Sequence, residues 1–174
     1  MKNVVLLGFM GTGKSIIGRR LAVEFGYRFV DTDQLIEEVA GKRIPEIFSE
    51  EGEDWFRRLE TETILDVSER AGCVISTGGG APLNPDNLKA LGRNGILVSL
   101  KARPEVILKR VQKRAGERPL LRGPNPLSEI TRLLEEREVF YNRSAIIIDT
   151  SDIEVKESVR RIKERVLEIA GETP

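Results

Sequence analysis

The sequence predicts a single α/β domain of three layers, in which helices flank both faces of a five-stranded parallel sheet. Five short aliphatic runs alternate with segments of helical periodicity along the chain, which is the pattern of a parallel sheet. Apolar residues make up 40% of the chain and aromatic residues only 5%, so Val, Ile and Leu must form most of the core. A length of 174 residues fits one domain, and we expect residues 1–174 to form it.

The first half of the chain supplies three strands and the helices between them. The strands are expected at residues 4–7, 28–30 and 73–76, followed by Gly8, by Asp31 and by Gly78–Gly80. Helices are expected over 14–25, after Asp31 and over 53–70, because apolar residues recur there at helical spacing: Ile17, Leu21 and Phe25, then Leu35, Ile36 and Val39, then Phe56, Leu59, Ile64 and Val67. Pro45 is expected at the first position of a further helix.

The second half continues the alternation around one irregular stretch. Two strands are expected, at 96–100 and 145–148, and three helix starts, at Asn84-Pro85, at Pro104 and at a capping box from Ser151 to Glu154. Residues 114–126 break the pattern with glycines, prolines and three arginines. They are typical of an arginine-bearing loop that can move, although a solvated surface connection would have the same composition.

Charge and residue usage exclude several classes of function. Lys plus Arg and Asp plus Glu both number 28, which argues against a general role in binding nucleic acid or membrane surfaces. The chain has no histidine and a single cysteine, Cys73, so histidine-dependent triads, histidine-ligated metals and internal disulfides are excluded. A metal would have to be a hard ion held by oxygen, which points to Mg²⁺. With no signal peptide and no apolar run of membrane-spanning length, we expect a cytoplasmic protein.

A phosphate-binding loop is the strongest motif. The segment from Gly8 to Ser15 reads Gly-Phe-Met-Gly-Thr-Gly-Lys-Ser, which matches G-x-x-x-x-G-K-[ST] between a predicted strand and a predicted helix. Glycines let backbone N–H groups turn inward, and the helix start directs its positive dipole end at the phosphates. Lys14 would bridge the β- and γ-phosphates of ATP, and the Ser15 hydroxyl would ligate Mg²⁺.

Two carboxylates follow the second strand. Asp31 and Asp33 are separated by one residue, and alternate residues of extended backbone point the same way, so both could face the phosphate loop. One could hold Mg²⁺, often through water, and the other could accept a proton from an acceptor hydroxyl. Capping of the next helix by Asp33 is an equally ordinary use of the residue.

A glycine triplet and two arginines complete the candidate set. Gly78, Gly79 and Gly80 end the third strand and permit a ligand to approach the backbone closely. Arg57 and Arg137 are each close in sequence to glutamates, so each could be an ordinary exposed helix charge, as in an Arg57–Glu60 pair. An anionic acceptor would favour the other interpretation, because arginine binds a carboxylate with two parallel hydrogen bonds.

Taken in order, these motifs resemble the shikimate kinase family from Val4 to about Thr150. The similarity comprises the phosphate loop, Asp31-x-Asp33, Phe56-Arg57-x-x-Glu60, the glycine triplet, Arg118-Pro119-Leu120-Leu121 and Arg137-x-x-x-Tyr141. The resemblance implies a nucleoside-monophosphate-kinase-like P-loop fold with a mobile lid at about 113–126. It also implies ATP-dependent phosphorylation of the 3-hydroxyl of shikimate by a monomer, with Mg²⁺ as cofactor.

The resemblance also assigns roles to individual residues. Lys14, Asp33 and Arg118 would be catalytic, with Asp33 as candidate base and Arg118 on the lid over ATP. Ser15 and Asp31 would serve the metal. The ATP site would comprise Gly11, Thr12, Gly13, Lys14, Ser15, Ile16, Arg110 and Arg118. The shikimate site would comprise Asp33, Arg57, Gly78, Gly79, Gly80 and Arg137, with both arginines on the carboxylate.

The chain departs from the family pattern at two points, and other functions stay open. Ile16 stands where the family usually has Thr, which removes one possible phosphate contact, and the stretch from Arg110 to Arg118 is one residue longer than usual. Adenylate-type kinases usually have Thr-Gly-Asp where this chain has Asp31-Thr32-Asp33, but a gluconate-type kinase would also bind a carboxylate. A nucleotide-binding switch without an acceptor is the alternative from a different class.

Overall fold

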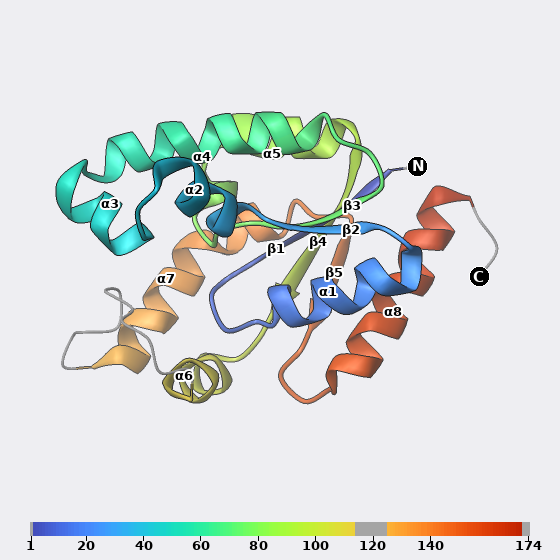
Figure 1. The fold of residues 1–174 in the computed structure, drawn as a ribbon. Coiled ribbons are helices and arrows are strands. Elements are labelled where there is room, and N and C mark those ends of the chain that lie inside the picture. Colours follow the sequence, from blue (N-terminus) through green and yellow to red (C-terminus); the bar gives the residue numbers. More distant parts are fainter. Residues whose placement is uncertain (1, 114–124, 172–174) are drawn as a thin grey trace.

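The computed structural model describes residues 2–113 and 125–171, and its centre is a parallel five-stranded sheet (Figure 1). The strands lie in the order β2-β3-β1-β4-β5 and comprise β1 Asn3–Gly8, β2 Arg28–Asp31, β3 Cys73–Ser76, β4 Gly95–Lys101 and β5 Ile146–Asp149. Every pair of neighbouring strands is parallel. The predicted strands and the three-layer fold class are therefore confirmed.

Helices cover both faces of the sheet, as Figure 1 shows. They are α1 Lys14–Phe25, α2 Thr32–Ala40, α3 Ile44–Glu50, α4 Glu53–Ser68, the short 3₁₀ helix η1 Ala81–Leu83, α5 Pro85–Arg93, α6 Pro104–Gln112, α7 Pro126–Tyr141 and α8 Val155–Ala170. None of the described helices is long and apolar enough to cross a membrane. The predicted lid lies almost wholly in residues 114–124, outside the described part of the chain.

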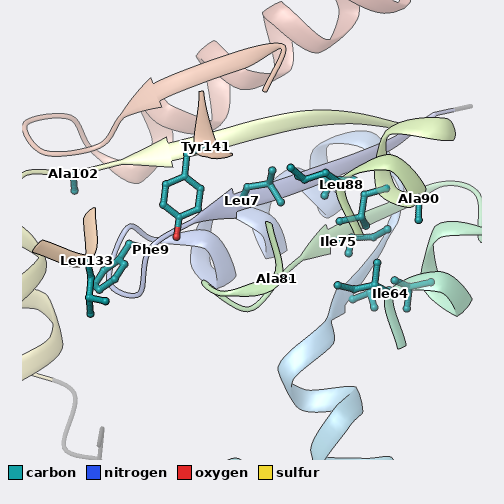
Figure 2. Close-up of a cluster of buried hydrophobic side chains, with 14 of the residues drawn as sticks. Leu7, Phe9, Ile64, Ile75, Ala81, Leu88, Ala90, Ala102, Leu133 and Tyr141 are labelled. Carbon is teal, nitrogen blue, oxygen red and sulfur yellow. The ribbon is translucent and has the colours of Figure 1, made fainter. Parts of the chain in front are cut away.

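Strand β1 directs apolar side chains to both faces of the sheet. Val5 and Leu7 pack into one apolar cluster with residues of α4, α5, α6 and α7, part of which Figure 2 shows. Val4 and Leu6 point the other way, into a second cluster under α1 and α8. All six residues of β1 are buried, so its hydrophobic run needs a cover on each side.

Most helix boundaries agree with the sequence, and the exceptions have local causes. Asn84 caps α5 as predicted, with its side chain accepting a hydrogen bond from the Asp86 backbone N–H. The predicted capping box at Ser151 is wrong, because α8 begins at Val155 with Glu154 as its N-cap residue and no side-chain cap. Ser151 belongs to the preceding turn, where its hydroxyl accepts a hydrogen bond from the Arg103 backbone N–H at 2.9 Å.

The strand ends bring the candidate motifs together at one edge of the sheet. In the register, Ser76 of β3 pairs with both Leu6 of β1 and Asp31 of β2. The phosphate loop, the acidic pair and the glycine triplet therefore leave the sheet side by side, as expected for sites at the carboxyl ends of parallel strands.

Candidate active site

The loop between β1 and α1 has the backbone that a phosphate cradle needs. Gly8, Gly11 and Gly13 have φ angles of 141°, 77° and 101°, which residues with a side chain rarely adopt. A Cβ atom at Gly8 would collide with the Leu100 carbonyl oxygen. The buried Thr12 hydroxyl donates to the Phe9 carbonyl at 2.8 Å and fixes the turn from inside. The glycines are therefore required by the backbone of this loop.

Lys14 begins α1 and reaches back over the loop. Its Nζ donates hydrogen bonds to the carbonyl oxygens of Gly8 and Phe9, at 2.7 and 3.0 Å. The ammonium group is thus held beside the loop whose N–H groups would bind phosphate.

Asp31 and Asp33 lie near each other but face different partners. The Asp31 carboxylate accepts from the Ser15 hydroxyl at 3.1 Å and caps α2 by accepting from the Asp33 backbone N–H at 3.2 Å. The expectation that both residues lie in extended backbone is wrong, because α2 begins at Thr32 and Asp33 is already in its first turn. Capping by Asp33 is also wrong, since Asp31 is the cap.

Asp33 is half-buried against the glycine triplet. A Cβ atom on Gly78 would lie 2.6 Å from the Asp33 Oδ1 and 3.0 Å from the Glu60 Oε1, so only glycine leaves both carboxylates room. Burial and then the charge of Asp31 raise the pKa of Asp33 to about 6, although the Lys14 ammonium acts to lower it. A carboxyl group that titrates near neutrality is suited to accept a proton from a hydroxyl.

Arg57 and Arg137 come from different helices to the same triplet. Arg57 of α4 forms an ion pair with Glu60 at 2.7 Å, as expected for an ordinary helix charge. Its guanidinium group also lies close to Gly80, since a Cβ atom added to that glycine would be only 2.5 Å from the Arg57 Nη1. Arg137 of α7 donates to the Gly79 carbonyl oxygen at 3.5 Å. Both guanidinium groups therefore lie against the triplet, which favours the interpretation that they bind an anionic acceptor.

Glu60 lies beside the glycine triplet, and it was not among the candidate site residues predicted from the sequence. Its side chain is 2% exposed, and burial raises its pKa even though its ion pair with Arg57 acts in the opposite direction. The charge of Arg137 also favours its ionised form. The available signal was its position, because Glu60 falls in the helical stripe of Phe56, Ile64 and Val67, where an apolar residue is expected.

A cavity of about 290 Å³ adjoins the phosphate loop, lined by residues that include Gly11, Thr12, Gly13, Ile16, Arg110 and Thr150. The Arg110 guanidinium donates to the Thr150 hydroxyl at 3.0 Å and to the Gly11 carbonyl at 3.3 Å. The buried Thr150 hydroxyl in turn donates to the Thr12 carbonyl at 2.9 Å. The fold thus brings Arg110 and Ile16 to the predicted ATP region, whereas Arg118 lies outside the described residues.

A larger groove of about 820 Å³ lies between α1 and α8, away from these motifs. Several of its charges are already neutralised within the groove, since Lys163 pairs with Glu24 and Arg160 with Glu157. We therefore assign it no part in the site.

The oxygen atoms near the phosphate loop fit Mg²⁺. The Ser15 hydroxyl and the Asp31 carboxylate lie 3.1 Å apart and offer two hard oxygen donors. The described residues contain no cluster of three or more acidic, Cys or His side chains that could hold a metal. Mg²⁺ commonly keeps several waters and takes one or two protein ligands plus phosphate oxygens, so a pair of donors is enough.

Comparison with known proteins agrees with this geometry. A model of the family described as shikimate kinase matches residues 10–167. The chain is similar to the shikimate kinase of Caldanaerobacter subterraneus subsp. tengcongensis, with 44% identity over 171 residues, which cover 98% of this chain and 99% of that protein.

Solved structures give the same result. The structure of shikimate kinase from Acinetobacter baumannii in complex with shikimate is 35% identical, has a TM-score of 0.91, and the match covers 97% of this chain and 94% of that one. A gluconokinase from Sinorhizobium meliloti is 17% identical with a TM-score of 0.62 over 98% and 94% of the two chains, a likeness that concerns the fold alone.

Proposed function

The chain belongs to the shikimate kinase family, and on that premise we propose how its own residues carry out the reaction. The chain phosphorylates shikimate with ATP, giving shikimate 3-phosphate and ADP on the route to chorismate and the aromatic amino acids. The observation that carries the proposal is the convergence of Arg57 and Arg137 on the glycine triplet, beside Asp33 and the phosphate loop.

The acceptor would lie between these groups. Its carboxylate would be bound by Arg57 and Arg137, and the backbone of Gly78–Gly80 would line the same pocket. Asp33 would then face the hydroxyl that is phosphorylated, because its carboxylate lies against Gly78 and feels the charge of the Lys14 ammonium. An acceptor held in this way needs no covalent intermediate, since phosphoryl transfer depends on positioning and charge stabilisation.

The nucleotide would lie across the phosphate loop. Its phosphates would meet the N–H groups of residues 11–16 and the Lys14 ammonium, while Arg110 would lie beside its base. Mg²⁺, held by Ser15 and through water by Asp31, would neutralise charge on the phosphate oxygens. Arg118 would add positive charge from the lid, and we propose that the protein acts as a cytoplasmic monomer.

The proposed function is tested by ADP release from the purified protein with ATP and Mg²⁺. We expect strong stimulation by shikimate and none by gluconate or AMP. Stimulation by another acceptor alone would agree with the function assigned to the phosphate loop but would contradict the assignment of the two arginines to the shikimate carboxylate. Slow ATP hydrolysis that no acceptor stimulates would support the nucleotide-binding switch instead.

Replacing Arg137 or Arg57 with alanine is expected to raise the KM for shikimate by roughly 10- to 100-fold, since hydrogen bonds to charged groups contribute about 1.5–3 kcal/mol. The KM for ATP should change little. Arg137→Ala is the cleaner variant, because Arg57→Ala also removes the ion-pair partner of the buried Glu60.

Steady-state kinetics with each substrate varied in turn measure this effect, and Arg58→Ala is the matched control. Arg58 is an exposed neighbour on the same helix, so its removal should leave both KM values unchanged. A rise in the KM for ATP with an unchanged KM for shikimate would mean that the two arginines are assigned to the wrong pocket.

A further inference from the structure

Tyr141 is a buried residue of the Arg137-x-x-x-Tyr141 motif to which the reaction described above gives no role. It is the last residue of α7 and is 3% exposed. Its hydroxyl donates a hydrogen bond of 2.8 Å to the carbonyl oxygen of Gly79, the central residue of the triplet. In Figure 2 the hydroxyl end of the ring points to the side on which Phe9 and Ala81 lie.

The same carbonyl oxygen is where Arg137 makes its contact. Arg137 and Tyr141 are four residues apart on α7 and so share one face of the helix. The Arg137 Nη1 lies 3.5 Å from the Gly79 oxygen, and its guanidinium carbon lies 5.5 Å from the centroid of the Phe9 ring. Of the two contacts to Gly79, that of Tyr141 has the shorter distance, so it is the stronger constraint on this carbonyl group.

Tyr141 is itself fixed to the sheet. Its backbone carbonyl accepts a 2.7 Å hydrogen bond from the buried Ser99 hydroxyl of β4, and that hydroxyl also lies 2.7 Å from the Ser144 hydroxyl. The glycine triplet has no side chains with which to hold its own position. A rigid neighbour that binds its central carbonyl can therefore set the path of the loop.

We propose that Tyr141 is a positioning residue for the acceptor pocket, whose hydroxyl holds Gly79 and Arg137 at the separation from Arg57 that the acceptor carboxylate requires. This inference rests on the function proposed above, because it assigns Arg137 to the acceptor. Tyr141 would touch neither the reacting atoms nor the nucleotide.

The Tyr141 hydroxyl stays protonated and can therefore always donate its hydrogen bond. Burial raises the pKa of Tyr141 to about 12, even though the adjacent Arg137 guanidinium acts to lower it. The hydroxyl therefore stays protonated over the range in which kinases are assayed, and its hydrogen bond to Gly79 is kept throughout.

The first test is Tyr141→Phe, which removes one oxygen atom and keeps the ring in the core. We expect the KM for shikimate to rise about 3- to 10-fold, as for the loss of one hydrogen bond, with the KM for ATP and kcat unchanged within about 2-fold. Tyr27→Phe is the matched control, because Tyr27 stacks on Phe25 beyond the end of α1 and should affect neither constant. Unchanged kinetics in Tyr141→Phe, or equal rises in both KM values, would overturn the proposal.

A double-mutant cycle with Arg137→Ala separates positioning from a general loss of structure. If Tyr141 acts through Arg137, adding Tyr141→Phe to Arg137→Ala should raise the KM for shikimate by less than about 2-fold, which is less than the effect of Tyr141→Phe alone, because the two residues are coupled. Full additivity of the two effects would contradict the proposal. A failure of the proposed function is seen separately, because the unmodified protein would then show no ADP release that depends on shikimate.

Discussion

Replacing Lys14 with alanine is expected to lower kcat/KM for shikimate phosphorylation by about 10³-fold or more. The Lys14 ammonium lies over the phosphate loop, held by the carbonyl oxygens of Gly8 and Phe9. In this position it can neutralise charge on the transferring phosphoryl group, and a single preorganised donor of this kind commonly accounts for factors of about 10² to 10³. A full positive charge among several phosphate oxygens should reach or exceed the upper end of that range.

The measurement is shikimate-dependent ADP release, with Lys89→Ala as the control. Lys89 is an exposed residue of α5, far in the sequence from the phosphate loop, and its removal should leave the rate unchanged. Because Lys14 also bonds to loop carbonyls, thermal unfolding of the variant should be compared with that of the unmodified protein. A folded Lys14→Ala protein with normal activity would refute the assignment of the phosphate loop.

Replacing Asp33 with asparagine is expected to reduce kcat on the order of 10²-fold or more, because the amide cannot accept the proton of the acceptor hydroxyl. The pKa of Asp33 is raised to about 6, so in the unmodified enzyme kcat/KM should increase as the pH rises through this value. The variant should lose this step in its pH profile. A mild reduction in kcat with the step retained would leave Asp33 as a positioning group rather than the base.

The same substitution should stabilise the empty protein above neutral pH. The pKa of Asp33 is raised from 3.8 to about 6, so the folded state binds the proton more tightly than the unfolded state. The stabilisation of the folded state by this proton is therefore fully present below the pKa of the unfolded chain. It is lost as the pH rises through the folded-state pKa of about 6. With about 1.4 kcal/mol per pKa unit, the ionised Asp33 should destabilise the folded chain by about 2 to 3 kcal/mol at higher pH.

Thermal unfolding at about pH 8 and about pH 4 checks this sign. For a chain of this size the gain corresponds to a rise in Tm of several degrees, at roughly 2–4 °C per kcal/mol, at the higher pH only. Asp86→Asn, an exposed substitution in the first turn of α5, is the control; it should leave kcat unchanged and should not raise Tm at either pH, since it removes a charge that favours the helix N-terminus. A lower Tm for Asp33→Asn at the higher pH would mean that the carboxylate stabilises the folded state, contrary to the direction of its pKa.

Local patterns in the sequence were sufficient for the elements and for the phosphate loop. The strand before Gly8, the glycines of the loop and the helix after Gly13 are all specified by residues close in the chain, because backbone sterics and side-chain periodicity act over a few residues. The same holds for the cap at Asn84, which the structure confirms. Local reasoning failed at Ser151 because its partner, Arg103, is distant in the chain, and at Asp33 because Asp31, two residues earlier, is the cap of the helix.

The family resemblance predicted that Arg57 and Arg137 bind one carboxylate. The residue types alone were equally compatible with two ordinary exposed charges on helices. The tertiary structure decided that the two arginines meet at Gly79 and Gly80, that Glu60 is buried beside them, and that Tyr141 holds the Gly79 carbonyl. These contacts join α4 and α7 across the glycine triplet. The sequence by itself therefore determined the elements and the phosphate cradle, whereas the acceptor pocket depends on strand order and helix packing, which bring together side chains that no local interaction relates.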